Sequence, residues 1–212
     1  MMAIGARIRS MCGPYEPLVS NLWRSIFVDV TEWTQTVQKW APRPRQILEV
    51  GCGEGYSTAR LAEAYPGVGI DAIDIAGNIG RLYDGPPGAA SFRIAYAENI
   101  ARERPASYDL IVLSDVLHHV PPGQRLSLLE AIRTLLAPGG VLALKDWHRA
   151  PAMPIHWAVY FSDRWLTGDR VAYLRRTEAR DMIVRVFGGH AIFAEAFIRP
   201  WQNNYAFCII AE

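Results

Sequence analysis

The sequence predicts an α/β fold: a seven-stranded, mostly parallel sheet with a final antiparallel strand, helices on both faces and an N-terminal helical extension. Three observations lead to this fold class. An apolar run at 46–50 enters a glycine-rich turn that opens a helix-compatible segment. Further apolar runs alternate with segments of helical periodicity, as in βαβ units. Near the C-terminus, two apolar runs are joined by the short connection 199–204, which favours an antiparallel pair.

The composition indicates one globular domain with an appended element. The chain has 212 residues, half of them hydrophobic and a fifth charged, which is enough to form a core. Its formal net charge of +1 does not favour nucleic acid or an acidic membrane as partner. We expect no signal peptide and no membrane span, because no long apolar run is present. The 3 cysteines, far apart and odd in number, favour a reduced, cytoplasmic setting.

Residues 16–40 predict one long helix within an N-terminal cap, residues 1–44. Apolar residues recur four and three positions apart and form a single stripe: Val19, Trp23, Ile26, Val30, Trp33, Val37 and Trp40. We favour a helix that packs across the domain. A lid over the substrate and a homodimer face are the alternatives, because so apolar a stripe must be covered. Tyr15 is a candidate on the substrate side.

The turn at 51–55 indicates a site for a polar ligand. Its three glycines let the backbone come close to a ligand, and the following helix presents N–H groups. A dinucleotide-binding turn would have its third glycine at position 56, where this chain has Tyr56. Glu49 adds negative charge beside the turn, which argues against a pyrophosphate and suits a ligand with an ammonium group.

Asp74 is the candidate for binding a ribose. It ends the predicted strand 68–75, about 20 residues past the turn, the interval at which an acid reaches ribose hydroxyls. A carboxylate there can accept hydrogen bonds from both hydroxyls of a diol. Asp71 competes for the role, but it lies within the strand instead of at its carboxyl end.

The run 49–55 closely resembles the first motif of class I S-adenosylmethionine-dependent methyltransferases of the small-molecule type. The segments 69–75, 97–100, 108–121 and 136–144 are similar to this family in order and spacing. The resemblance covers residues 47–146 and implies a Rossmann-like domain over 45–212. It also implies S-adenosylmethionine as cofactor and a small organic molecule as methyl acceptor, through oxygen, nitrogen or carbon.

The resemblance implies a set of cofactor-binding residues at the ends of successive strands. They are Glu49, Gly51, Cys52, Gly53, Asp74, Ile75, Ala97, Glu98 and Ser114. One position departs from the family pattern: Tyr96 stands where an aspartate that contacts the adenine amino group is usual. Cys52 is interpreted as a small residue in the turn and not as a reactive thiol.

The acceptor site is expected where the strands 108–113 and 141–145 end. Candidates for a base or orienting group are His119, Asp146, His148 and Tyr15. We interpret His118 as a surface or supporting residue. His119 has an alternative role in tethering its loop. We expect no metal site, because neighbouring histidines point to different faces and no second ligand pair accompanies them. The segment 151–176 is interpreted as an aromatic insert over the acceptor.

Three other functions compete with small-molecule methyl transfer. A nicotinamide-dependent dehydrogenase would need the glycine spacing that Tyr56 breaks. A methyltransferase-like protein that binds S-adenosylmethionine but cyclises or only binds its ligand is not excluded by any sequence feature. A protein or RNA methyltransferase is disfavoured by the near-neutral charge and by the absence of an Asn/Asp-Pro-Pro-aromatic motif after residue 113.

Overall fold

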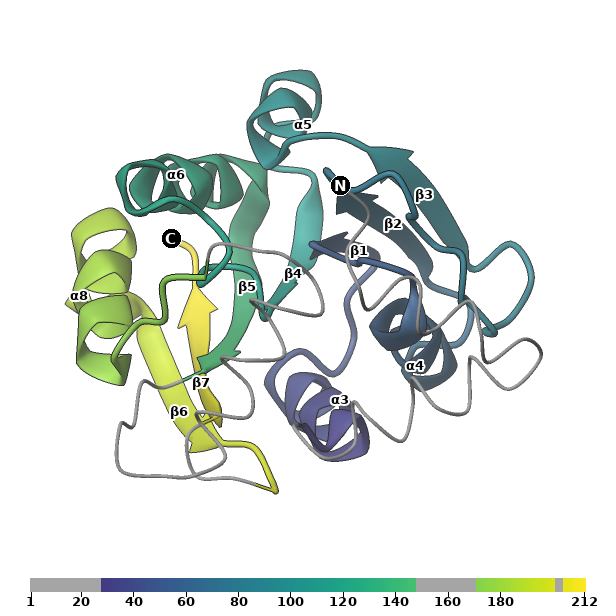
Figure 1. Cartoon of the computed structure of the whole chain (residues 1–212), viewed down its shortest axis with the longest axis horizontal. Coiled ribbons are helices and arrows are strands. Elements are labelled where there is room, and N and C mark those ends of the chain that lie inside the picture. Colours follow the sequence, from purple (N-terminus) through teal and green to yellow (C-terminus); the bar gives the residue numbers. More distant parts are fainter. Residues whose placement is uncertain (1–27, 148–170, 201–203) are drawn as a thin grey trace.

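The computed structural model describes residues 28–147, 171–200 and 204–212, which form a seven-stranded sheet (Figure 1). The strand order is β3-β2-β1-β4-β5-β7-β6. The strands are β1 Gln46–Val50, β2 Gly69–Asp74, β3 Ala90–Ile94, β4 Tyr108–Ser114, β5 Leu136–Trp147, β6 Ile192–Phe197 and β7 Asn204–Ile210. The predicted α/β architecture is confirmed.

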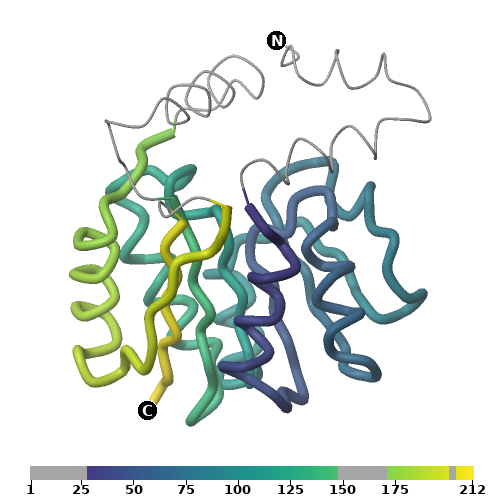
Figure 2. Tube along the Cα trace, turned by 90° about the horizontal axis from the view of Figure 1, so that it is seen from below, coloured from purple at the N-terminus to yellow at the C-terminus, as the bar shows by residue number. Residues whose placement is uncertain are grey.

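The register brings the carboxyl ends of five parallel strands to one edge of the sheet. Val50 of β1 pairs with Ile73 of β2 and with Leu113 of β4. On either side, β2 pairs with β3 and β4 pairs with β5, again in parallel. β7 runs antiparallel to both β5 and β6, so the C-terminus lies at the opposite edge, at the bottom of Figure 2. We call the edge where β1 to β5 end the carboxyl edge.

Helices cover both faces of the sheet, as the sequence predicts (Figure 1). α3 Val30–Trp40 and α4 Tyr56–Ala64 lie on one face, whereas α5 Ala97–Glu103, α6 Arg125–Leu135 and α8 Arg176–Phe187 lie on the other. Two 3-10 turns, Pro122–Gln124 and Gly189–Ala191, precede α6 and β6. Each face has its own hydrophobic core, and the sheet separates the two.

The predicted helix over 16–40 is wrong at its middle, because α3 begins only at Val30. Asp29 has an extended backbone, and its carboxylate accepts a hydrogen bond from the Glu32 N–H at 2.9 Å, which caps the new helix. A cap residue supplies an acceptor that a continuing helix would not need. Residues 1–27, and with them any lid or dimer role of the N-terminal cap, lie outside the described residues.

The described part of this segment is a layer of the core. Trp33 and Val37 of α3 are buried against α4 and the sheet, and Trp33 meets Trp40 edge to face at 6.0 Å. The apolar stripe predicted for the helix is therefore covered, over Val30–Trp40, by the domain itself.

Besides α3, two further elements differ from the sequence prediction. β5 is longer than the predicted 141–145, because Leu136 already pairs with Tyr108 before a shift in register. The short helix α5 follows β3 directly and was not expected, although Ala and Glu at its start are good helix formers. In the part of the chain that the structure describes, no helix has the length and apolar character needed to cross a membrane.

We expect the change Trp33→Ala to destabilise the fold by about 3–5 kcal/mol, as for other buried tryptophans that leave a cavity. Urea denaturation followed by circular dichroism measures the effect. The control is Gln35→Ala, an exposed position on the same helix. Equal stability of the two variants would show that α3 is not part of the core.

Candidate active site

The glycine turn after β1 is fixed to the end of β2. The Gly51 and Cys52 N–H groups both donate to the Ile73 carbonyl, at 2.8 and 3.1 Å. Gly51 has φ +78°, and a Cβ built there would come within 2.2 Å of the Val116 side chain, so the position requires glycine. Around Gly53, in contrast, a Cβ would meet no atom within 4 Å. The turn therefore keeps open space at its tip, on the carboxyl edge.

Asp74 holds the tip of this turn from β2. One carboxylate oxygen accepts the Gly53 N–H at 2.8 Å, and the other accepts the Ala76 N–H at 2.9 Å. The side chain is half-buried, and each carboxylate oxygen has a further lone pair. Asp71, the competing residue, is engaged elsewhere: its carboxylate accepts from Ser91, Arg104 and Tyr108.

Glu49 lies beneath the turn, with 1% of its surface exposed. Its two oxygens accept hydrogen bonds from the hydroxyls of Ser57 and Thr58 in the first turns of α4, the latter at 2.5 Å. Burial raises the pKa of the Glu49 carboxyl, against the lowering effect of the two hydroxyl donors. Glu49 thus ties β1 to α4, and its predicted role towards a ligand's ammonium group stays a prediction.

The other predicted cofactor residues border the same edge. Burial raises the pKa of the Cys52 thiol, and the charges of Glu49 and Asp74 add to this effect, so Cys52 is not a reactive thiolate. Ala97 and Glu98 begin α5 directly after β3, and Ser114 is the last residue of β4.

Beside Asp74, the carboxyl edge has apolar side chains that the described residues leave exposed. Their exposed fractions are 64% for Ile75, 59% for Ile94 and 60% for Tyr96. These residues follow or end β2 and β3, whose carboxyl ends pair at Asp74 and Ile94. Polar acceptors at Asp74 and an apolar surface beside it together suit a ligand with a sugar and a flat ring.

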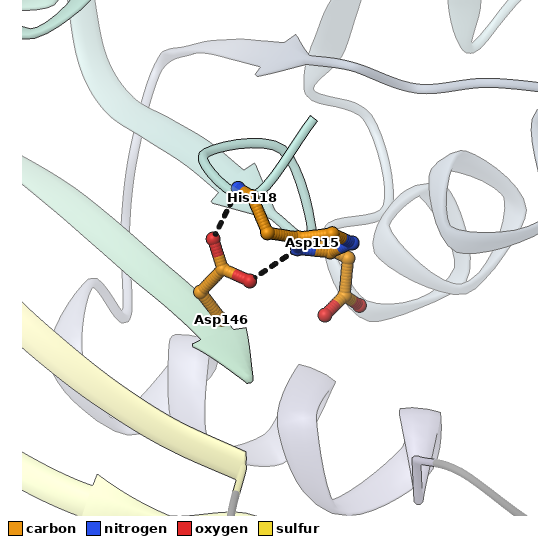
Figure 3. A group of neighbouring side chains, drawn as sticks. All are labelled: Asp115, His118 and Asp146. Atoms are coloured by element: carbon orange, nitrogen blue, oxygen red, sulfur yellow. Dashed lines mark hydrogen bonds and ion pairs between the residues drawn. The ribbon is translucent and has the colours of Figure 1, made fainter. Parts of the chain in front are cut away.

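Asp146 and His118 form a buried pair at the ends of β5 and β4 (Figure 3). The His118 ring Nδ1 lies 2.5 Å from one Asp146 oxygen, and the His118 backbone N–H donates to the other at 3.1 Å. The Trp147 N–H also donates to the carboxylate, at 2.7 Å. Burial alone would raise the pKa of Asp146, but His118, the Trp147 N–H and the charge of Lys145 lower it below the usual aspartate value.

A second charged pair lies next to this one. The fully buried Lys145 ammonium donates to both oxygens of Asp115, at 2.8 and 2.7 Å. Asp115 adopts φ +58°, so the chain turns sharply where β4 ends. The two pairs come from the same two strands, because Asp115 and His118 follow β4 whereas Lys145 and Asp146 end β5.

Asp115, His118 and Asp146 could each offer one ligand atom to a cation, since these atoms lie within 4.8 Å of one another. However, the Lys145 ammonium already takes both oxygens of Asp115, and Asp146 accepts three hydrogen bonds. A protein ammonium therefore supplies the positive charge at Asp115, which makes the group better suited to proton transfer than to holding a metal.

The structure describes two of the four predicted catalytic residues, Asp146 and His119. It confirms that Asp146 lies at the carboxyl edge, but Asp146 contacts His118, which we interpreted as a surface or supporting residue and which is 4% exposed. His119 is exposed, and its N–H donates to the Val116 carbonyl in the turn. His148 and Tyr15 lie outside the described residues, as does most of the insert 151–176. Sequence reasoning named His119 as the catalytic candidate and not His118, because nothing local shows which of two adjacent rings meets β5.

Comparison with known proteins agrees with this geometry. Residues 22–184 match the family described as "Methyltransferase domain". A ubiquinone biosynthesis O-methyltransferase from Xanthomonas campestris pv. campestris is 33% identical over 111 residues, 50% of this chain and 45% of that protein. An uncharacterized methyltransferase from Synechocystis is 32% identical over 117 residues, 53% of this chain and 50% of that protein. The chain thus spans about half the length of these curated relatives.

Solved structures share the fold. The S-adenosylmethionine-dependent methyltransferase SibL, in its apo form, superposes with a TM-score of 0.72 at 15% identity, over 100% of this chain and 62% of that one. The 1,6-didemethyltoxoflavin-N1-methyltransferase of Burkholderia thailandensis, with bound 1,6-didemethyltoxoflavin and S-adenosylhomocysteine, has a TM-score of 0.66 at 15% identity, over 97% and 88%. At this identity, the likeness concerns the fold alone.

We expect Glu49→Gln to gain stability relative to the wild type as the pH rises. The pKa of Glu49 is higher in the folded than in the unfolded state. At pH values between these two pKa values, the folded protein therefore binds more protons than the unfolded protein. The free energy of unfolding falls as the pH rises through that interval. Glutamine has no proton to lose. Urea denaturation at a series of pH values above 4.5 measures the difference, with exposed Glu130→Gln as control. Parallel pH profiles for the two variants would contradict the prediction.

Proposed function

Because the chain belongs to the methyltransferase domain family, we propose that it transfers a methyl group from S-adenosylmethionine to a small organic molecule at the carboxyl edge of its sheet. The single observation that carries the proposal is the hydrogen bond from the Gly53 N–H to Asp74, which joins the glycine turn to an acid at the end of the neighbouring strand. This places an open backbone turn and a half-buried carboxylate side by side at a position where α/β sheets bind nucleotides.

The residues at this edge fit S-adenosylmethionine in two respects. Asp74 is oriented by two backbone N–H groups and can accept further hydrogen bonds from a ribose diol. The apolar surface of Ile75, Ile94 and Tyr96 suits the adenine ring, which would cover side chains that are otherwise exposed. In this proposal Glu49 supports the turn from below through α4 and adds negative charge near the amino-acid end of the cofactor.

S-adenosylmethionine supplies an electrophilic methyl group on a sulfonium. The protein's task is then to align donor and acceptor and to exclude water, because the methyl group is already activated. The acceptor lies, in our proposal, beside the ends of β4 and β5, where His118, Asp115 and Asp146 gather. The relatives named O-methyltransferases favour an oxygen acceptor, and the near-neutral net charge of +1 favours a small molecule over nucleic acid.

Two assays test the proposal. Isothermal titration with S-adenosylhomocysteine measures cofactor binding, with NADH as the competing ligand. Incubation with methyl-labelled S-adenosylmethionine and a panel of small phenols, amines and acidic carbon compounds then tests transfer. Label in an acceptor supports methyl transfer. Binding of the cofactor without a labelled acceptor would favour the alternative, a related protein that cyclises or only binds its ligand.

We expect Asp74→Ala to weaken binding of S-adenosylhomocysteine by about 1–3 kcal/mol, because charged hydrogen bonds to the ribose are lost. The matched control is Asp71→Ala, whose carboxylate is engaged by Ser91, Arg104 and Tyr108 away from the turn. Titration calorimetry measures both variants, and urea denaturation confirms that each is folded. If Asp71→Ala weakens the binding of S-adenosylhomocysteine more than Asp74→Ala does, the assignment of the ribose site to Asp74 is wrong.

A further inference from the structure

Strand β6 exposes two large aromatic side chains that the proposed function does not use. Within the described residues, the other large apolar side chains that are exposed lie beside Asp74 at the carboxyl edge. Phe193 is 71% exposed and Phe197 is 48% exposed, and both belong to β6. Exposed apolar side chains gathered on one surface indicate a place where a partner binds.

β6 is an edge strand, because the strand order ends with β7-β6 and no strand in the described part of the chain lies beyond it (Figure 1). Phe197 pairs with Tyr205 of β7. At the next position, the Ile198 N–H donates to the Asn204 carbonyl at 2.9 Å. Hydrogen-bonded and non-hydrogen-bonded pairs alternate along an antiparallel ladder, so the N–H and C=O of Glu195 point away from β7. Outward polar groups on an edge can pair with a further strand.

The sequence of this edge is a palindrome. Residues 193–197 read Phe-Ala-Glu-Ala-Phe in both directions. A two-fold axis at Glu195 therefore places Phe193 of one copy opposite Phe197 of a second copy, on both sides of the axis. A two-fold interface needs a self-complementary surface of this kind, because each copy contributes the same residues. Aromatic side chains directly opposite each other stabilise an antiparallel strand pair.

The charge at the centre of the edge is compensated within the chain. Charged side chains on an edge strand usually oppose pairing with another chain. The Glu195 side chain is 24% exposed, and its carboxylate accepts hydrogen bonds from Arg176 and Arg180 of α8. The Arg176 guanidinium also lies over the Phe197 ring, 5.2 Å from the ring centroid. Two Glu195 side chains can then lie opposite each other, because each has arginines of its own chain beside it.

The N-terminal end of β6 is irregular. Its register against β7 shifts between Ile192 and Ala194, which marks a β-bulge. A bulge twists an edge strand and shortens the length over which another strand can pair. We therefore expect an interface at the small end of the range for specific contacts, in which the backbone bonds of Glu195 and the two aromatic contacts carry the association.

We propose that two copies of this chain associate through β6, as an antiparallel pair with its two-fold axis at Glu195. The N–H and C=O of Glu195 bond to the same groups of the second copy. Glu195 and Phe197 face α8, and the alternation of side chains along a strand places Phe193 on the same face. β6 and β3 are the two ends of the sheet, so the glycine turn and Asp74 stay accessible in this dimer.

Sedimentation velocity of the full chain over a series of concentrations tests the association. We expect a reversible monomer–dimer equilibrium for the wild type. Phe197→Lys should raise the dissociation constant of the dimer by about tenfold or more, because each interface loses two aromatic contacts and gains two charges. The control Ser127→Lys adds the same charge at an exposed position of α6 and should dimerise as the wild type does. Circular dichroism confirms that both variants are folded.

Disulfide trapping tests the position of the two-fold axis. Phe193→Cys and Phe197→Cys are made separately in a chain with Cys12→Ser, since Cys52 and Cys208 are buried. Opposite residues of an antiparallel pair have Cα atoms about 4.5–5.5 Å apart, which is within the range for a disulfide. We expect a mixture of the two variants to form a covalent dimer under mild oxidation, whereas each variant alone forms little.

Three results would overturn the proposal. The first is a wild type that stays monomeric at every concentration. The second is a Phe197→Lys variant that dimerises as the wild type does, because another surface would then hold the copies together. The third is a mixture of the cysteine variants that gives no covalent dimer, or one that gives no more than Phe193→Cys alone. None of these results depends on methyl transfer, so the proposed function is tested separately.

Discussion

The parallel pairing of β1 with β2 and with β4 is the constraint on which the site depends. It places Val50, Ile73 and Leu113 side by side, so that the residues following each strand emerge at one edge. The turn at Gly51 can then bond to the Ile73 carbonyl, and Asp74 can reach the Gly53 N–H. A shift of one residue in this register would reverse which side chains face each layer and would separate these groups.

The two halves of the edge have different chemistry because different strands supply them. Where β1, β2 and β3 end, the structure has an open glycine turn, one anchored carboxylate and exposed apolar side chains. Where β4 and β5 end, it has buried charges paired across the two strands, Lys145 with Asp115 and Asp146 with His118. In the proposed function, the first half binds the nucleoside and the second half lies beside the acceptor.

Buried charges are tolerated here because each one has a partner with good geometry. Removing one member of such a pair leaves an uncompensated charge in the interior, which costs far more than the pair contributes. The buried carboxylate of Glu49 has neutral partners. Two hydroxyls of α4 donate hydrogen bonds to it and replace the water that it loses on folding. These polar groups therefore tie the strands to the turns and helices that carry the site.

The sequence by itself determined the architecture and the position of the glycine turn at the carboxyl edge. Apolar runs and glycine turns are local signals, and they gave the bounds of β1 as Gln46–Val50 and the start of α4 at Tyr56. It also placed Asp74 at the end of a strand and Asp71 within it, because the end of a strand can be recognised from its neighbours in the chain. Only the tertiary structure decided that α3 begins at Val30, with Asp29 as its N-terminal cap. It also decided that His118, and not His119, contacts Asp146. That contact joins residues 28 positions apart, and it depends on the pairing of β4 with β5, which no local pattern contains.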